Sequence, residues 1–419
     1  MPDYETVSPF KAISGTLTEV SFAEGVDYIG QNTFRDCSKL ETVNMPLTQP
    51  VIGKDAFKGT PYYKSTFDEK GLIISGTILC DGMYAEGDVV IPDGITEISN
   101  DAFKNNKNIT SIIIPESVKT VGASVFYGCT GLSSLTVPCD LDLYFDDNSF
   151  YGVTHLTRLT MTKGSGVMLS FGSKYLYTPW FRSSAVFSTI NLEEGITEIG
   201  SSAFRDLPNL TSVSIPSSVT RLGTYAFSGD SSIQSIALPD GFDYFGAAAL
   251  NNCTGLKELT LPCSTRFANN ANNFGNCTNI EKITLTKGTG VMPSYKDIFR
   301  LTPWYISRVN LKQLVLEDGI ENIGAFMFIY NSSLTDLEMP NSIKTIGASA
   351  FDHCTSLNRL IIPKGVTEIQ SSAFNGCSKL NEIVFLGNCL DSVGSSAFST
   401  TNGFPVHHQV PELAQTHVH

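Results

Sequence analysis

The stretch LNRLIIPKGVTEIQSSAFNGCSK, residues 357–379, contains the pattern that decides the fold. In its first half Leu357, Leu360 and Ile362 alternate with polar residues, as in a strand with one buried face. Pro363 follows directly, and it ends the strand because proline has no N–H to donate to a neighbouring strand. The first half therefore predicts a short strand with one apolar face.

The second half of the stretch supplies the rest of a repeating unit. Val366 and Ile369 are expected to point inward, Phe374 to fill the middle, and Cys377 to take a corner before the next leucine. Such a unit cannot bury its apolar edge alone. Stacked on neighbours, each large side chain contributes roughly 1.5–3 kcal/mol of burial, so the array folds as one cooperative body.

The phenylalanine of this unit recurs along the whole chain. Successive intervals are 23, 46, 23, 24, 54, 23, 23, 24, 54, 23, 23 and 24 residues. The basic unit is thus 23 or 24 residues, and each longer interval contains a modified coil. The positions are Phe34, Phe57, Phe103, Phe126, Phe150, Phe204, Phe227, Leu250 (a leucine in the same slot), Phe274, Phe328, Phe351, Phe374 and Phe398.

The count and spacing of the units predict an elongated solenoid. About fourteen strands at a spacing of ~4.8 Å would form a stack about 65 Å long. We expect mainly β-structure with short turns and short helical segments. Residues 1–16 are expected to form a lead-in or cap, residues 17–402 a single solenoid, and residues 403–419 a tail that breaks the repeat.

A longer period of 124 residues lies above the basic unit. TMTKGSGVMLS at 160–170 recurs as TLTKGTGVMPS at 284–294. The lysine and paired glycines suggest a phosphate loop, but the Gly-Lys-Ser/Thr ending and a following helical pattern are missing, so we expect a structural corner. A third, degenerate copy with TPYY at 60–63 precedes GLIISGTILCDGMYAEGDVVI, which we expect to form an inserted hairpin. The long or inserted coils lie near residues 60–90, 163–186 and 287–310.

The repeated motif resembles a known family. A strand L-x-x-L-x-I-P followed by G-V-T-x-I-G-x-x-A-F-x-x-C is similar to the BspA-like leucine-rich-repeat family, a bacterial surface-protein type of leucine-rich repeat. Close copies stand at 109–129, 210–227 and 334–354, and the resemblance covers about residues 17–400. It implies a curved, right-handed leucine-rich-repeat array. It also implies cell-surface or secreted placement and adhesion to host or extracellular matrix proteins, such as fibronectin and fibrinogen.

Charge and hydropathy narrow the classes of partner. A net charge of −13 and a pI near 4.9 argue against nucleic acid, which binds basic faces. No run of about 18 apolar residues occurs, so we expect no membrane-spanning segment. The sequence MPDYETVSPF at 1–10 shows no charged region followed by an apolar stretch, so no signal peptide is visible and the expected localisation rests on the resemblance.

The cysteines follow the repeat and favour a structural role. Six of them stand three residues after the phenylalanine or leucine of their unit, where a small apolar thiol fits a tight corner. Disulfides between adjacent units, Cys253 with Cys277 or Cys354 with Cys377, are the alternative, and we favour free buried thiols. The six are Cys37, Cys129, Cys253, Cys277, Cys354 and Cys377.

No pattern of catalytic or metal-binding residues emerges. The chain has no C-x-x-C, H-E-x-x-H or G-x-S-x-G motif, and four of its six histidines lie in the tail: His407, His408, His417 and His419. We therefore expect no enzyme activity, no cofactor and no metal site.

The outward positions of the strands form the candidate binding face, because solenoids usually bind along the sheet. On six strands starting between Ile109 and Ile233, eighteen outward positions carry one charge and are mostly Ser and Thr. On six starting between Leu256 and Leu380, nine of eighteen are charged. No aromatic residue occupies these positions, which disfavours a glycan ligand. The charged positions are Arg158 in the first half and Lys257, Glu258, Glu281, Lys282, Lys312, Asp336, Glu338, Arg359 and Glu382 in the second.

Two functions follow from this face. The first is a non-enzymatic recognition or adhesion protein that binds a protein ligand through the charged half, because mixed charges give orientation and specificity. The second is a structural spacer of a larger surface protein with no ligand of its own, in which the polar ladders only stabilise the sheet.

Overall fold

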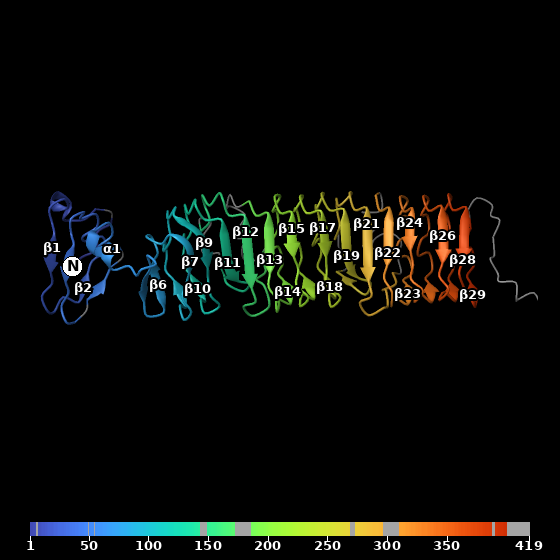
Figure 1. The fold of residues 1–419 in the computed structure, drawn as a ribbon, viewed down its shortest axis with the longest axis horizontal. Coiled ribbons are helices and arrows are strands. Elements are labelled where there is room, and N and C mark those ends of the chain that lie inside the picture. Colours follow the sequence, from blue (N-terminus) through green and yellow to red (C-terminus); the bar gives the residue numbers. More distant parts are fainter. Residues whose placement is uncertain are drawn as a thin grey trace, which may run out of the picture.

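The computed structural model describes residues 1–5, 7–48, 50–53, 55–142, 149–171, 186–268, 273–295, 310–387 and 390–399. Within these ranges the chain forms 29 short strands, one 3-10 turn at Lys11–Ile13 and one short helix, α1, at Pro61–Ser65. The strands stack side by side into the elongated array seen in Figure 1. No helix of the described ranges is both long and apolar enough to cross a membrane.

The main sheet takes one strand from each coil and consists of four hydrogen-bonded segments. A coil is here one turn of the solenoid, and it is named after its ladder residue, the recurring phenylalanine or Leu250. Its strands come from the L-x-x-L-x-I pattern, and every pair formed between them is parallel. In chain order they are β1 (Glu19–Ser21), β3 (Thr42–Asn44), β7 (Gly87–Val90), β9 (Ile109–Ile113), β11 (Ser134–Pro138), β12 (Arg158–Thr162), β13 (Thr189–Leu192), β15 (Ser212–Ser214), β17 (Ser235–Ala237), β19 (Glu258–Pro262), β21 (Lys282–Thr286), β22 (Gln313–Leu316), β24 (Asp336–Glu338), β26 (Arg359–Ile362) and β28 (Glu382–Phe385).

A second, lateral sheet is built from the V-T-x-I part of the repeat. Each of its strands is brief because the chain turns again before the ladder residue, and pairing from coil to coil is again parallel. They are β2 (Tyr28–Ile29), β4 (Val51–Ile52), β6 (Ile78–Asp81), β8 (Glu97–Ile98), β10 (Thr120–Val121), β14 (Glu198–Ile199), β16 (Arg221–Leu222), β18 (Tyr244–Phe245), β20 (Arg266–Phe267), β23 (Asn322–Ile323), β25 (Thr345–Ile346), β27 (Glu368–Ile369) and β29 (Ser392–Val393).

Stacked phenylalanine rings run through the middle of the coils, as the period predicts. Phe351 lies 5.6 Å from Phe328 and 5.3 Å from Phe374, with the rings within 10° of parallel. Phe398 continues the stack at 5.5 Å. These rings are almost fully buried up to Phe374, so each adds its whole apolar area to the core.

The third side of each coil is a turn-rich segment around the ladder residue, and it also bonds to the next coil. Phe204 N–H donates to the Ala226 carbonyl at 2.9 Å, and Asp206 N–H donates to the Ser228 carbonyl at 2.8 Å. The residues two before and two after the ladder position have positive φ. Most are Gly, Asn, Asp or Ser, but Tyr225 (φ 57) also holds this conformation, in which aromatic residues are rare.

The hairpin predicted after TPYY is confirmed. β5 (Ile73–Ser75) pairs antiparallel with β6 across the turn Gly76–Thr77, and Gly76 takes the positive φ (58°) that such turns require. β6 then joins the lateral sheet as its first strand in the longer stack. In this coil Gly82 stands against the ring of Phe103, where a Cβ would lie 2.2 Å from a ring carbon.

The hydrophobic core forms two separate clusters. The smaller one holds Ile29, Phe34 and Phe57, while the larger one begins at Leu72 and continues to Ala397. The first cluster is closed at its far end by Tyr62 of α1, whose ring meets that of Phe57 edge-on at 5.2 Å. Figure 1 shows the first coils set apart from the rest and joined to them by a single segment of the chain.

The glycine-lysine loops are corners. Gly288 (φ 50) and Gly290 (φ 80) turn the chain after β21, and Gly290 N–H closes the turn on the Lys287 carbonyl at 2.7 Å. Gly290 passes so close to the next coil that a Cβ would lie 2.7 Å from the Gly319 carbonyl oxygen. Val291 then bridges to Asn322 in the lateral sheet, so no helix begins in the described residues directly after the loop.

Candidate recognition surface

The outward positions of the main sheet form three columns, and none of the thirty-six positions considered is buried. The middle column is fixed by strand register: Glu258, Lys282, Gln313 and Asp336 are direct partners from β19 to β24. Arg359 and Glu382 are likewise partners across β26 and β28. The alternation read from the sequence thus places these side chains on one solvent-facing surface.

Several hydroxyl groups in the serine and threonine half of this surface form hydrogen bonds within the protein. Thr211 Oγ1 donates to the Ser188 carbonyl at 3.0 Å, and Ser133 Oγ donates to the Thr110 carbonyl at 3.0 Å. At the start of this half Asp88 of β7 accepts hydrogen bonds from Ser111 (2.6 Å) and Thr110 (2.9 Å), which lower the pKa of its carboxyl group. These hydroxyl donors therefore already have partners within the protein.

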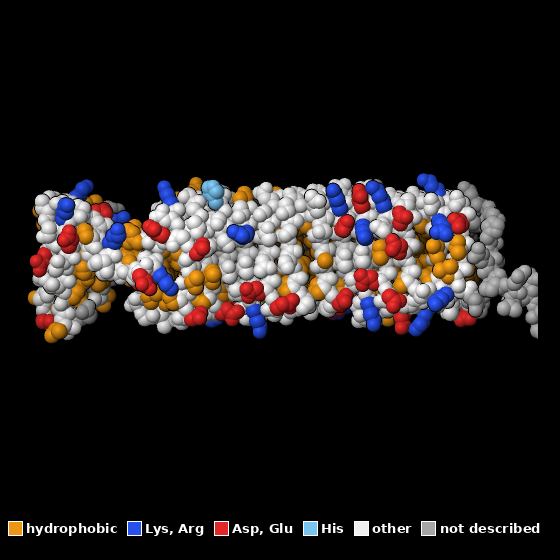
Figure 2. All heavy atoms as spheres, in the orientation of Figure 1, with side chains coloured by type: hydrophobic (Ala, Val, Ile, Leu, Met, Phe, Trp, Pro, Cys, Tyr) orange, Lys and Arg blue, Asp and Glu red, His pale blue; other side chains and the backbone are white. Residues whose placement is uncertain are grey.

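The charged half alternates in sign along the columns. Lys312 Nζ lies 3.2 Å from Glu281 Oε1, and Arg359 Nε lies 3.0 Å from Glu382 Oε2. These pairs are more than half exposed, so each contributes little to stability. Figure 2 shows both signs interspersed toward the C-terminal end of the visible face and few charges over its middle.

The ten charged positions predicted from the sequence are not all neighbours. Nine lie between β19 and β28, whereas Arg158 lies alone on β12, four coils away from Glu258. Five of the ten are basic and five are acidic, so the set carries no net charge. Six of the ten form no ion pair in the described part of the chain, and two of these, Asp336 and Glu338, accept side-chain hydrogen bonds. The other four, all exposed or half-buried, are left free to meet a partner: Arg158, Lys257, Glu258 and Lys282.

The repeat cysteines are free thiols and act as hydrogen-bond donors. Cys253 Sγ donates to the Phe227 carbonyl at 3.1 Å, and Cys129 Sγ donates to the Phe103 carbonyl at 3.0 Å. The expectation of buried free thiols is thus confirmed, and the weak S–H donor satisfies a carbonyl that the turn leaves inside the coil. Burial raises the pKa of the Cys129 thiol to about 12, so this thiol is unreactive at neutral pH.

One coil carries an aspartate where most carry cysteine or asparagine. Asp230 is completely buried; its Oδ1 accepts a hydrogen bond from Leu207 N–H at 2.7 Å, and its Oδ2 has no hydrogen-bond partner. Burial raises the pKa of this carboxyl group well above its ordinary value. Asp230 is a destabilising element of the core, and it faces no solvent from which a substrate could reach it.

The described residues contain no group of three or more His, Cys, Asp or Glu side chains placed to hold a metal ion. His155 and His353 lie in turns, with His155 Nδ1 2.9 Å from the Thr130 carbonyl oxygen and His353 Nδ1 2.7 Å from Asp352 Oδ1. The four tail histidines lie outside the described residues.

Sequence reasoning overlooked a set of aromatic and cationic side chains in the turns and on the lateral sheet. Tyr127 stacks on Tyr151 at 5.4 Å, and Lys104 Nζ lies 5.5 Å from the Tyr127 ring centre. Arg221 lies over the Tyr244 ring at 4.8 Å. A residue directly after the ladder phenylalanine, as Tyr127 and Tyr151 are, was the available signal. These contacts lie on the solenoid outside the main sheet, and their cation–π interactions stabilise the packing of neighbouring coils.

Comparison with known families gives a match over most of the chain. A family model described as "BspA type Leucine rich repeat region (6 copies)" matches residues 8–78, 86–177, 174–299 and 304–406. A search of curated proteins finds no significant match.

Solved structures with similar folds include three bacterial proteins. A leucine-rich repeat protein from Eubacterium ventriosum is 22% identical over 90% of this chain and 87% of its own, with a TM-score of 0.33. A leucine-rich repeat protein from Bacteroides ovatus is 22% identical over 91% of this chain and 76% of its own (TM-score 0.31). A leucine rich cell surface protein from Faecalibacterium prausnitzii is 21% identical over 81% and 94% (TM-score 0.32). Because these scores lie below 0.5, the assignment of the fold rests on the strand pairing described above.

Proposed function

The chain belongs to the BspA-type leucine-rich repeat family, and from this premise we propose that it is a non-enzymatic, cell-surface or secreted recognition protein that binds a protein ligand. The ligand would be a host or extracellular matrix protein. The binding surface would be the charged half of the main sheet, from β19 to β28.

One observation carries this proposal: the two halves of the sheet differ in what they leave for a partner. The first half offers mainly hydroxyl groups, several of which donate to carbonyls of the preceding coil, as Thr211 does to Ser188. In the second half Lys257, Glu258 and Lys282 make no ion pair within the described residues. Charges without an internal partner steer association and select a partner of complementary pattern.

The experiment is binding of the purified chain to an array of extracellular matrix and plasma proteins. A variant carrying Lys257→Ala, Lys282→Ala, Lys312→Ala and Arg359→Ala removes four cations from the face. A matched control carries Lys39→Ala, Lys119→Ala, Lys364→Ala and Lys379→Ala, four exposed lysines away from the sheet columns. We expect saturable binding that the first variant loses and the control keeps, with both unfolding at the parent's temperature.

A structural spacer is the second candidate function. The alternation of signs along the columns favours it, because pairs such as Lys312 with Glu281 stabilise a solvent-facing sheet without any ligand. A chain that binds nothing on the array while keeping its fold would favour the spacer. We propose for either function that residues 1–16 form the cap, 17–402 the solenoid and 403–419 a tail.

A further inference from the structure

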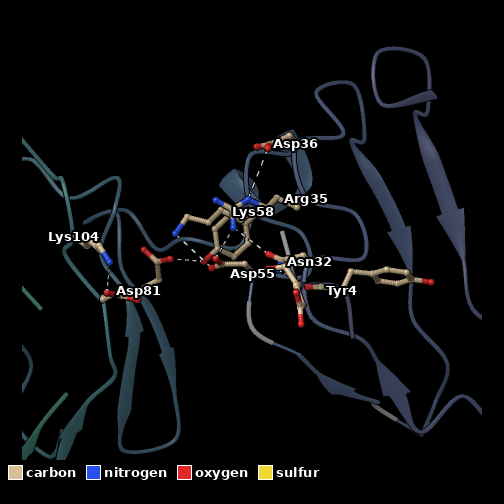
Figure 3. Close-up of polar contacts among 11 residues, drawn as sticks. Tyr4, Asn32, Arg35, Asp36, Asp55, Lys58, Asp81 and Lys104 are labelled. Carbon is tan, nitrogen blue, oxygen red and sulfur yellow. Dashed lines mark hydrogen bonds and ion pairs between the residues drawn. The ribbon is translucent and has the colours of Figure 1, made fainter. Parts of the chain in front are cut away.

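The two stacks of coils leave a cleft where they meet. It has a volume of about 750 Å³ and lies between the Phe57 coil on one side and the β5–β6 hairpin with β8 on the other. Its walls include Ile52 and Phe57 from the first stack and Ile73 and Asp81 from the second. Figure 3 shows Asp81 directed across this junction toward Asp55 and Lys58.

The Phe57 coil presents unused backbone groups to this cleft. In the equivalent coil of Phe204, the carbonyls of Thr197 and Ile199 accept hydrogen bonds from the next coil, and two N–H groups donate to it. The equivalent carbonyls here are those of Pro50 and Ile52, and the equivalent N–H groups are those of Phe57 and Gly59. None of these four groups has a hydrogen-bond partner among the described residues. The edge can therefore accept one more segment that follows the course of a repeat coil.

The other end of the same stack shows how such an edge is filled. The first residues of the chain lie along the Phe34 coil, where Tyr4 N–H donates to the Gln31 carbonyl at 3.1 Å and Asp3 Oδ1 accepts from Gln31 N–H at 2.7 Å. Phe10 continues the ring stack on Phe34 at 4.8 Å. An extended segment that is not a repeat coil thus closes the opposite edge of this stack (Tyr4 and Asn32 in Figure 3).

The charges around the cleft indicate which segment fits. Among the described residues that line it, four are carboxylates (Asp55, Asp81, Glu97 and Asp101) and one is a lysine (Lys58). Asp55 is paired with Arg35 at 3.0 Å, and Asp101 is paired with Lys104 at 2.8 Å. Asp81 accepts hydrogen bonds only from Tyr63 Oη and Met83 N–H, and Glu97 has no basic partner in the described chain. Asp81 and Glu97 thus form no ion pair in the described chain, although Lys58 lies near enough to Asp81 to oppose the rise in pKa that burial causes there.

We propose that this cleft binds a peptide segment of another protein that follows the bent course of a repeat coil and carries a lysine or arginine side chain. The peptide backbone donates to the carbonyls of Pro50 and Ile52 and accepts from the N–H groups of Phe57 and Gly59. Its cation is held by Asp81 and Glu97. As in β-strand addition, main-chain hydrogen bonds give affinity and a side chain gives selectivity, but here the segment adds one further coil to the stack.

A peptide with the required groups exists within the chain itself. The segment TRLGTYAFSG, residues 220–229, donates from Thr220 and Gly223 and accepts at Ala226 and Ser228 when it follows the Phe204 coil. The probe is this peptide, acetylated, amidated and labelled with fluorescein, titrated with the full chain and followed by anisotropy. Two modified peptides serve as controls: one N-methylated at Thr220 and Gly223, and one with Arg221→Glu.

The expected result is saturable binding that each modified peptide weakens by about tenfold or more, because each loses hydrogen bonds or the ion pair. A chain variant with Asp81→Asn and Glu97→Gln is expected to lose about tenfold for the arginine peptide and nothing for the Arg221→Glu peptide. A distal variant with Asp240→Asn and Glu317→Gln, both exposed, should bind as the parent does. The main-sheet variant, in which three lysines and Arg359 are replaced by alanine, should also bind as the parent does, which separates this site from the proposed adhesion face.

Several results would overturn the proposal. The first is binding that does not saturate by about 1 mM peptide, which is the weak end of specific recognition. The second is equal affinity of the N-methylated and unmodified peptides. The third is cross-linking from a benzophenone at the Phe227 position of the peptide to residues outside 50–101. Dimerisation of the chain that cross-links one cleft to another copy and that peptide does not displace would assign the cleft to self-association instead.

Discussion

The hydroxyl group of Tyr63 donates a hydrogen bond to Asp81 Oδ2 at 2.5 Å, and the two residues belong to different stacks of the solenoid. Asp81 is buried, and burial raises the pKa of its carboxyl group while the Tyr63 hydrogen bond opposes that rise. This contact and the packing of Phe67 on Tyr84 (4.8 Å) fix the junction between stacks.

Substitution Tyr63→Phe should loosen the junction and the first stack without affecting the far end of the second stack. It leaves a buried carboxyl group without its donor, which costs about 1–3 kcal/mol. Hydrogen–deuterium exchange should accelerate in residues 28–60 and stay unchanged in residues 334–385. Tyr151→Phe, in an exposed turn, is the control. Equal acceleration in both regions would contradict two separate clusters.

The stacked phenylalanine rings predict that substitutions of Phe351 lower the free energy of unfolding by different amounts. Phe351→Ala removes a fully buried ring stacked on both sides and should lower the free energy of unfolding by about 3–5 kcal/mol. Phe351→Leu should cost clearly less, because Leu250 already occupies the same slot of another coil in full burial. Urea unfolding followed by tryptophan fluorescence measures both. A leucine variant as unstable as the alanine variant would show that the slots are not equivalent.

The buried Asp230 predicts a stabilising substitution. Asp230→Asn keeps the acceptor for Leu207 N–H and supplies a donor in place of the unpartnered oxygen, so we expect a gain of about 1–3 kcal/mol at pH 7. The gain should depend on pH. Because the folded-state pKa lies above the unfolded value of about 3.9, the parent loses stability as pH rises from about 4 toward the folded pKa.

Thermal unfolding at several pH values checks this dependence. The difference between Asp230→Asn and the parent should be smallest near pH 4 and should grow as pH increases. The exposed Asp240→Asn should show no such trend. A difference that shrinks with increasing pH would contradict the assigned direction of the pKa shift.

The cysteine ladder predicts protection from alkylation. Cys129, Cys253, Cys354 and Cys377 are fully buried with raised thiol pKa values, so iodoacetamide at pH 8 should label them only as fast as the chain unfolds. Among the cysteines that the structure describes, the half-buried Cys80 should react first. Mass spectrometry of the labelled peptides gives the rates. A Cys253–Cys277 or Cys354–Cys377 disulfide in non-reduced digests would contradict the free-thiol ladder.

The period of the ladder residues was sufficient to predict the solenoid, its inward and outward faces and the β5–β6 hairpin, because each coil repeats the same burial requirement. The split of the core at residues 61–72 was not predictable. The sequence shows that the Phe57–Phe103 interval lacks one phenylalanine, but a missing ring is equally compatible with a modified coil and with an interruption. The presence of Tyr225 at positive φ also escaped prediction, since the inter-coil hydrogen bonds override its intrinsic preference.

The sequence predicted which residues lie on the candidate face but not which of them contact one another. Alternation placed Lys282 beside Glu258 on neighbouring strands, and register confirms this. Which charges pair depends on side-chain reach: Lys312 pairs with Glu281, whereas Lys257, one coil before Glu281, forms no ion pair in the described chain. The cleft beside Asp81 arises where the two stacks of coils are interrupted, and no motif in the sequence marks this interruption.

The measurement that tests the central claim most directly is hydrogen–deuterium exchange of the chain with and without the protein captured on the matrix and plasma array. If the charged half of the main sheet is the recognition surface, protection should appear in β19, β21, β22 and β24 and be absent from β9, β11 and β13. Protection confined to the serine and threonine half, or to the cleft between the stacks, would contradict that assignment.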